Sequence, residues 1–144
     1  MVGITAENKF VLDTCAIINI LENRSIADLI KCHIDCENSR VYLNSVSLDE
    51  ASRKGYGKKY VISKISEYLD TLVIIKEVNE ENHVNAQRLE KNCHLIHHGD
   101  SAIAAFSVDN KSTLVTYDKD LLKGCHILGI PTFSPNRMIG GITA

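Results

Sequence analysis

The sequence lacks several features that would assign it to a specialised class. It contains no unbroken apolar run of the roughly 18 to 20 residues that a membrane-spanning helix needs. Its first residues, MVGITAENK, lack the basic and apolar regions of a signal peptide. It also shows no internal repeat, linker or low-complexity tract. We therefore expect a cytoplasmic protein without a membrane segment that folds as one domain over residues 1–144.

The cysteines and charges also exclude more than they indicate. The five cysteines are an odd number and include no C-x-x-C pair, so we expect reduced thiols and no structural zinc site. Cys32 and Cys36 lie four residues apart on a predicted helix, where they would serve as small buried hydrophobes. The formal net charge is only −2, so any binding to nucleic acid must come from a local patch.

What the sequence does contain is a regular alternation of strand and helix patterns. With 44% hydrophobic residues, the chain can bury a core without disulfides or metal. The predicted strands cover residues 9–13, 40–44, 72–76, 112–116 and 126–133, and the run LVIIK at 72–76 is typical of a strand buried on both faces. The predicted helices cover 14–21, 25–36 with Ser25 as N-cap, 45–55 ending at Gly55, 59–69, 79–92, 100–110 and 118–124 ending at Gly124.

This alternation predicts an α/β fold. Each connection between strands is long enough to cross over, so the strands would lie parallel with helices on both sides. The expected architecture is a three-layer α/β/α sandwich around a central parallel sheet of four or five strands.

Four acidic residues fall where a parallel α/β sheet usually binds its ligand. Ligands of such sheets gather outside the carboxyl ends of the strands. Asp13 ends the first strand, Asp118 follows the fourth, Glu50 lies in the helix after the second, and Asp100 opens the helix before the fourth. These four side chains can therefore converge on one edge of the sheet.

Each acid also has a simpler interpretation. Asp100 would suit the first turn of its helix, and Asp118 would cap the helix that follows it. Asp13 is the strongest candidate, because a neutral Ser or Thr could fill any capping role at that position equally well. Clustered carboxylates repel one another unless a cation screens them. Hard cations such as Mg²⁺ or Mn²⁺ take oxygen ligands and activate water for attack on phosphodiesters.

The order and spacing of these acids resemble the PIN-domain family of metal-dependent nucleases, which includes the ribonuclease toxins of type II toxin–antitoxin pairs. The resemblance runs from VLDTCAII through LNSVSLDEASRKG and HHGDSAIAAFS to STLVTYDKDLLKG. It implies a sandwich of helices around a parallel sheet. It also implies a metal site, which is the catalytic site, formed by Asp13, Glu50, Asp100 and Asp118, with the hydroxyls of Thr14 and Thr116 nearby.

Several positions depart from the family pattern or need a choice. Cys15 stands where the family often has Asn, so a polar contact to the first acid would be missing. Leu121 replaces a common Phe with little consequence. Asp49 and Glu50 are adjacent, and one helical step turns a side chain by about 100°, so only one can face the site; the family register favours Glu50. Asp120 would either support Asp118 or face water.

Two further groups of residues are candidates for substrate contacts. RKGYGKK at 53–59 carries four cations and Tyr56, so that Arg53 and Lys54 could contact phosphate while Tyr56 stacks on a base. A solvated helix end explains the same pattern. The histidines of HLIHHGD (His94, His97 and His98) have no second ligand group at zinc spacing, and their role stays open.

The resemblance implies an endoribonuclease that uses Mg²⁺ or Mn²⁺ to hydrolyse RNA, single-stranded or looped. A toxin with an antitoxin partner and an RNA-processing nuclease fit the sequence equally, and apolar helix faces would permit a homodimer. Two alternatives belong to other classes. A haloacid-dehalogenase-type phosphatase would need an acid at position 15, where this chain has cysteine, and a binding module without activity would not need all four acids.

Overall fold

The computed structural model describes residues 8–34 and 38–135. Within these ranges it contains five strands, β1 (Lys9–Leu12), β2 (Arg40–Asn44), β3 (Leu72–Lys76), β4 (Thr113–Val115) and β5 (Thr132–Phe133). The helices are α1 (Thr14–Glu22), α2 (Arg24–His33), α3 (Ser45–Arg53), α4 (Lys58–Leu69), α5 (Glu80–Asn92), α6 (Asp100–Asp109) and α7 (Lys119–Leu128). None of the helices described is long and apolar enough to cross a membrane.

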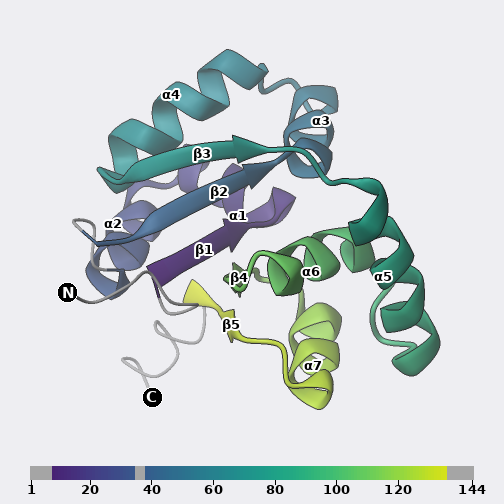
Figure 1. The fold of residues 1–144 in the computed structure, drawn as a ribbon. Helices are drawn as coiled ribbons and strands as arrows, with labels where there is room; N and C mark the ends of the chain where they lie inside the picture. Colours follow the sequence, from purple (N-terminus) through teal and green to yellow (C-terminus); the bar gives the residue numbers. More distant parts are fainter. Residues whose placement is uncertain (1–7, 35–37, 136–144) are drawn as a thin grey trace.

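The strands form one parallel sheet in the order β3-β2-β1-β4-β5, with β1 at its centre (Figure 1). Phe10 on β1 pairs with Val41 of β2 on one side and with Thr113 of β4 on the other. Because all strands run the same way, the loops that follow them meet at one end of the sheet. The expected α/β sandwich with a parallel sheet is confirmed, with five strands.

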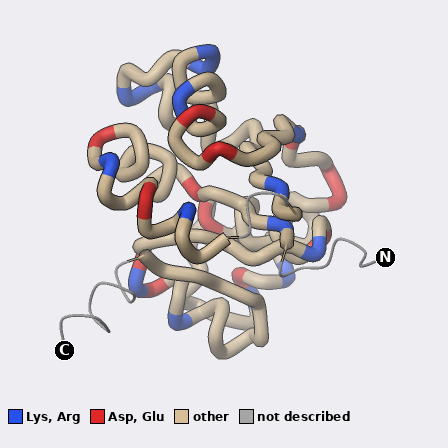
Figure 2. Tube along the Cα trace, turned by 90° about the vertical axis from the view of Figure 1, so that its left-hand side faces the viewer, with Lys and Arg blue, Asp and Glu red and all other residues tan. Residues whose placement is uncertain are grey.

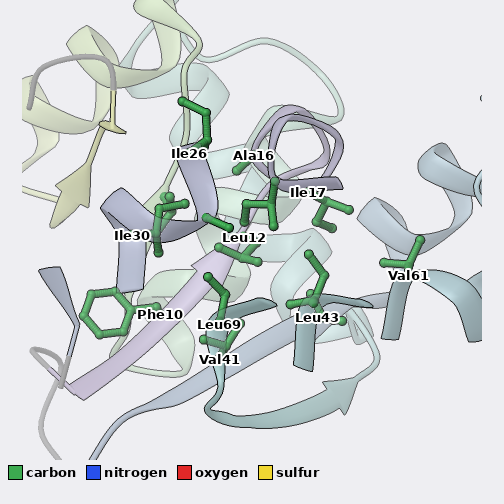
Figure 3. Packing of buried hydrophobic residues seen from close by; sticks show 14 of the residues in the cluster. Phe10, Leu12, Ala16, Ile17, Ile26, Ile30, Val41, Leu43, Val61 and Leu69 are labelled. Carbon is green, nitrogen blue, oxygen red and sulfur yellow. The ribbon is translucent and has the colours of Figure 1, made fainter. Parts of the chain in front are cut away.

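Alternate residues of each strand face opposite layers of helices. Phe10, Leu12 and Leu43 join the buried cluster shared with α1, α2, α3 and α4 (Figure 3). Val11 and Leu114 point to the other face, where α6 and α7 cover the sheet and α5 packs against α6. The protein therefore has one hydrophobic core on each face of the sheet, and β1 lies between the two layers of helices.

The structure corrects the prediction that the third strand is buried on both faces. β3 is an edge strand, and Leu72 and Ile75 are 58% and 51% exposed. Only Val73 and Ile74 pack, each partly, against the two core clusters. An unbroken apolar run predicts double burial only for a central strand, and hydrophobicity alone does not give a strand's position in the sheet.

The last predicted helix is longer than expected and the last strand shorter. α7 continues through Gly124 and ends at Gly129, whose φ of 73° is the left-handed conformation typical of a helix end. Gly124 serves packing instead, because a β-carbon there would lie 2.6 Å from Cγ1 of Ile96. Residues 126–128 are consequently helical, and β5 contains only Thr132 and Phe133.

Two smaller predictions in the α2 region are also wrong. Asn23, not Ser25, caps α2, and its side-chain oxygen accepts a hydrogen bond from the Ser25 amide at 3.0 Å. Both residue types are good N-caps, so sequence alone did not separate them. Cys32 is exposed, contrary to its predicted burial, and Cys36 lies outside the described residues.

Candidate functional site

Asp13 lies at the end of the central strand and is almost fully buried. Its amide donates a hydrogen bond to the Val115 carbonyl at 3.2 Å, which continues the pairing of β1 with β4 past the strand. It is also the N-cap of α1, since its Oδ1 accepts from the Ala16 amide at 2.9 Å. Asp13 thus has the capping role that the sequence could not establish, and this role fixes its side chain at the sheet edge.

The second oxygen of Asp13 connects this residue to β4. The hydroxyl of Thr116, a fully buried residue, donates a short hydrogen bond to Oδ2 of Asp13. The same hydroxyl oxygen accepts from the Asp118 amide at 3.1 Å. Asp118 in turn caps α7 through a bond from the Leu121 amide to its Oδ1 at 3.0 Å. Thr116 therefore positions two of the predicted site acids at once.

Glu50 reaches the same end of the sheet from α3. The hydroxyl of Thr14 on α1 donates to Oε2 of Glu50 at 2.8 Å. The neighbouring Asp49 points elsewhere, because its carboxylate pairs with Lys58 at 2.7 Å and is half exposed. The structure therefore separates the two adjacent acids as the helical geometry predicts, with Glu50 beside Thr14 and Asp49 at the surface.

Asp100 is the first residue of α6 and follows Gly99, whose φ of 98° turns the chain into the helix. Burial raises the pKa of Asp100 to about 6, with further contributions from the negative charges of Asp118, Asp13 and Glu50. These contributions show that the four acids share one electrostatic environment, although they come from four parts of the chain. Burial raises the pKa of Asp13 most strongly. The hydrogen bonds that Asp13 accepts act in the opposite direction, and the charge of Asp118 raises the pKa further.

The four acids influence one another electrostatically but form no ready-made metal-binding group. Among the residues that the structure describes, no three His, Cys, Asp or Glu side chains lie close enough for one. An ion that keeps several of its waters does not require all carboxylates to touch it directly. The oxygen-only donors and the raised pKa of Asp100 fit a hard divalent cation, which would remove the repulsion between these acids.

Cys15 supplies the polar contact that the sequence comparison suggested was missing. Its thiol donates to both oxygens of Asp13, at 3.1 and 3.3 Å. Burial and then the charge of Asp13 raise the pKa of Cys15 to about 12, so the thiol stays protonated and can donate. No acidic group follows Asp13 at the position that a dehalogenase-type phosphatase would use.

Tyr117, between Thr116 and Asp118, is a residue that the sequence analysis did not select. Its hydroxyl is buried without a hydrogen-bond partner in the described part of the chain. Burial raises its pKa to about 12, with smaller contributions from Cys15 and Asp13. Its aromatic ring packs against the core cluster of α1 to α4. No motif identified it, because its position depends on the fold of β4.

The predicted substrate residues differ in their surroundings. Arg53 and Lys54 are exposed at the end of α3, three and four residues after Glu50, and hence next to it on the helix. Tyr56 is partly buried against the core, and its hydroxyl donates to Glu22, so we assign no base stacking to it. Asp120 is exposed and faces His97 rather than Asp118.

Charge over the whole molecule is mixed. Figure 2 shows lysines and arginines grouped near the top of the molecule, where α3 and α4 lie, with acidic residues below them. The basic residues of that region include Arg53, Lys54, Lys58 and Lys59. Lys58 is already paired with Asp49. The described residues therefore include a local group of cations at the end of α3 and the start of α4, although the net charge of the chain is −2.

Proteins with a parallel α/β sandwich form a class that generally binds ligands beyond the carboxyl ends of the strands. The chain belongs to one family of this class, because the model of the PIN domain matches residues 10–126. PIN domains are generally nucleases. No curated protein matches the chain in sequence.

Several solved structures share the fold of this chain. The complex VapBC2 from Rickettsia felis, bound to a DNA fragment from its promoter, contains a chain that is 17% identical, with a TM-score of 0.63 over 88% of this chain and 98% of that one. A chain of VapBC-1 from nontypeable Haemophilus influenzae is 17% identical, with a TM-score of 0.63 over 89% of this chain and 98% of that one. A chain of FitAcB from Neisseria gonorrhoeae is 21% identical, with a TM-score of 0.55 over 88% of this chain and 97% of that one. At these identities the likeness establishes the fold alone.

Proposed function

We propose that this protein is an endoribonuclease that depends on Mg²⁺ or Mn²⁺ and uses Asp13, Glu50, Asp100 and Asp118 as its metal-binding and catalytic acids. The observation that supports the proposal best is the hydrogen-bonded arrangement of the acids, in which Thr116 contacts both Asp13 and Asp118 and Thr14, on the helix that Asp13 caps, donates to Glu50. Burial, and then the charges of the other three acids, raise the pKa of Asp100 to about 6. Repulsion between four carboxylates at one edge of the sheet lowers the stability of the folded protein. A bound cation would offset that cost and make use of the arrangement.

The residues around the acids would hold them in position for this role. Thr116 and Cys15 donate hydrogen bonds to Asp13, and Thr14 donates to Glu50, so these carboxylates keep fixed orientations. A divalent cation at this place supplies Lewis-acid activation of water and neutralises charge that develops on a phosphate. The carboxylates provide the hard oxygen ligands that Mg²⁺ and Mn²⁺ prefer.

Single-stranded or looped RNA is the substrate that we infer. A phosphate flanked by unpaired nucleotides can approach a partly buried group such as Asp100 more easily than one inside a stiff duplex. Arg53 and Lys54 would contact neighbouring phosphates from the end of α3, next to Glu50. Lys58 contributes less, because Asp49 already neutralises it.

A cleavage assay tests the activity. The purified protein is incubated with a mixed pool of single-stranded RNA in Mn²⁺ or Mg²⁺, with and without a chelator. We expect cleavage that the chelator abolishes and that Asp13→Asn reduces by at least about a hundredfold, as for a group that acts on the transition state. Asp49→Asn is the matched control, since Asp49 is an adjacent acid that pairs with Lys58 at the surface. Equal cleavage by the parent and Asp13→Asn would refute the proposal.

We also propose that an antitoxin protein binds this chain, because several structures with the same fold are the complexes VapBC and FitAB. A role as a toxin and a role in RNA processing differ in one simple consequence. A toxin arrests growth when it is expressed alone, and co-expression of a small protein encoded beside it restores growth.

Dimerisation of the chain stays a prediction that light scattering of the purified protein would test.

A further inference from the structure

Two neighbouring histidines before α6 have different partners. His97 Nε2 lies 3.5 Å from Oδ2 of Asp120 on α7, whereas His98 Nδ1 lies 3.5 Å from Oε1 of Glu90 on α5. The sequence HLIHHGD gives no reason to prefer one of them. The structure therefore distinguishes a histidine that contacts α7 from one that contacts α5.

The position of His97 is determined by packing beneath it. The preceding residue, Ile96, is 2% exposed and fits against α7 where Gly124 has no side chain. The His97 carbonyl accepts a hydrogen bond from the Ser101 amide at 2.9 Å, which joins His97 to the first turn of α6. The segment that carries His97 is thus anchored to α6 by this hydrogen bond and to α7 by the side chain of Ile96.

The partner of His97 provides a second indication that this histidine lies beside the site. Asp120 follows Asp118 by two residues on the first turn of α7. The His97–Asp120 pair therefore spans the gap between the helices that carry two of the four acids.

Stability alone does not account for this pair. The side chains of His97 and Asp120 are 61% and 54% exposed, and exposed ion pairs contribute between zero and about 1 kcal/mol. The second ring nitrogen of His97, Nδ1, has no hydrogen-bond or ion-pair partner among the described residues. An imidazole held at one nitrogen and exposed at the other can contact an incoming polar ligand.

We propose that His97 is a substrate-positioning residue that contacts the RNA backbone beside the four acids, and that Asp120 acts by holding His97 and not by binding the metal. This inference rests on the proposed ribonuclease function. In it, Nε2 is turned toward Asp120, and Nδ1 faces a phosphate oxygen of the bound strand.

A double-mutant cycle tests the assignment. His97→Gln, Asp120→Asn and the double variant are compared with the parent for binding of a fluorescently labelled single-stranded RNA in EDTA and for KM and kcat of its cleavage in Mn²⁺. We expect each single variant to weaken binding and raise KM by on the order of 3- to 10-fold, the value of one hydrogen bond to a charged group. The double variant should be no weaker than either single variant, because both changes remove the same contact.

His98→Gln is the matched control, since it is the same substitution one residue away and disturbs only the pair with Glu90. It should bind and cleave RNA like the parent. A merely structural role for the pair would change the midpoint of thermal unfolding and leave KM unaltered.

Three results overturn the inference. These are a silent His97→Gln variant, additive effects in the double variant, and a loss of Mn²⁺ affinity in Asp120→Asn, measured by calorimetry, that His97→Gln does not share. The last result would assign Asp120 to the metal. If the parent neither binds nor cleaves RNA, the proposed function fails as well. If the parent does both and His97→Gln matches it, only this inference fails.

Discussion

Replacing Asp100 by Asn should stabilise the protein in the absence of metal, although Asp100 is a proposed ligand. The folded pKa of Asp100, about 6, lies above its ordinary value of 3.8, because burial and three other acids disfavour its charge. The difference is roughly two pKa units, equivalent to about 3 kcal/mol if it were fully expressed at neutral pH. Asp100 is partly exposed, and solvent screening reduces the expected gain to about 1–2 kcal/mol.

The sign of the pH dependence follows from linkage. Between pH 4 and 6 the folded protein holds a proton on Asp100 that the unfolded chain has released, so lowering the pH through this window stabilises the parent. The advantage of Asp100→Asn should therefore be full at pH 7.5 and should shrink as the pH falls toward 4. Saturating Mn²⁺ should reverse the order, because only the parent gains the binding free energy of the ion.

Urea unfolding followed by circular dichroism, in EDTA at pH 7.5 and 5.0 and then in Mn²⁺, measures these differences. Asp49→Asn is the control, because the pKa of Asp49 is shifted in the opposite direction to that of Asp100. A hydrogen bond from Lys58 and its charge lower the pKa of Asp49, so removal of this carboxylate should not stabilise the protein at pH 7.5. If Asp100→Asn is less stable than the parent in EDTA at pH 7.5, the electrostatic reasoning is wrong.

Three further predictions concern packing, hydrogen bonding and charge. Gly124→Ala should lower the free energy of unfolding by about 1–3 kcal/mol, because the added carbon would lie 2.6 Å from Ile96, and an unchanged urea midpoint would contradict this. Cys15→Ser should retain more cleavage activity than Cys15→Ala, because only serine still donates to Asp13, and equal activities would exclude this role. Lys54→Ala should reduce the salt dependence of RNA binding, with a log–log slope smaller by about 0.7, whereas an unchanged slope would show that Lys54 does not touch phosphate.

The placement of Asp13 and Asp118 at one end of the sheet follows from a general property of parallel sheets, whereas the role of the four acids as a metal site stays a prediction. Asp13 follows β1 directly, Asp118 lies three residues after the end of β4, and the carboxyl ends of all parallel strands lie at one edge. The turn of about 100° per helical step showed that only one of Asp49 and Glu50 can face the site, and the resemblance to the PIN-domain family selected Glu50. The local sequence and the class of fold would not have made this choice.

The features that the sequence did not reveal depend on contacts between distant segments. The exposed edge position of β3 results from the order of the strands, which hydrophobicity does not encode. Gly124 had the appearance of a helix end, but its role is to admit Ile96 from another part of the chain. The hydrogen bonds of Cys15 and the contact of His97 with Asp120 likewise require coordinates, because no residue pattern states which side chain faces which.

Calorimetric titration with Mn²⁺ tests most directly whether the four acids form a site for a divalent cation. We expect saturable binding to the parent protein, binding weakened at least about tenfold in Asp13→Asn, and binding unchanged in Asp49→Asn, whose carboxylate pairs with Lys58 at the surface. If Asp13→Asn binds Mn²⁺ as tightly as the parent, or if the parent binds none, the acids do not hold a metal ion and the account is contradicted.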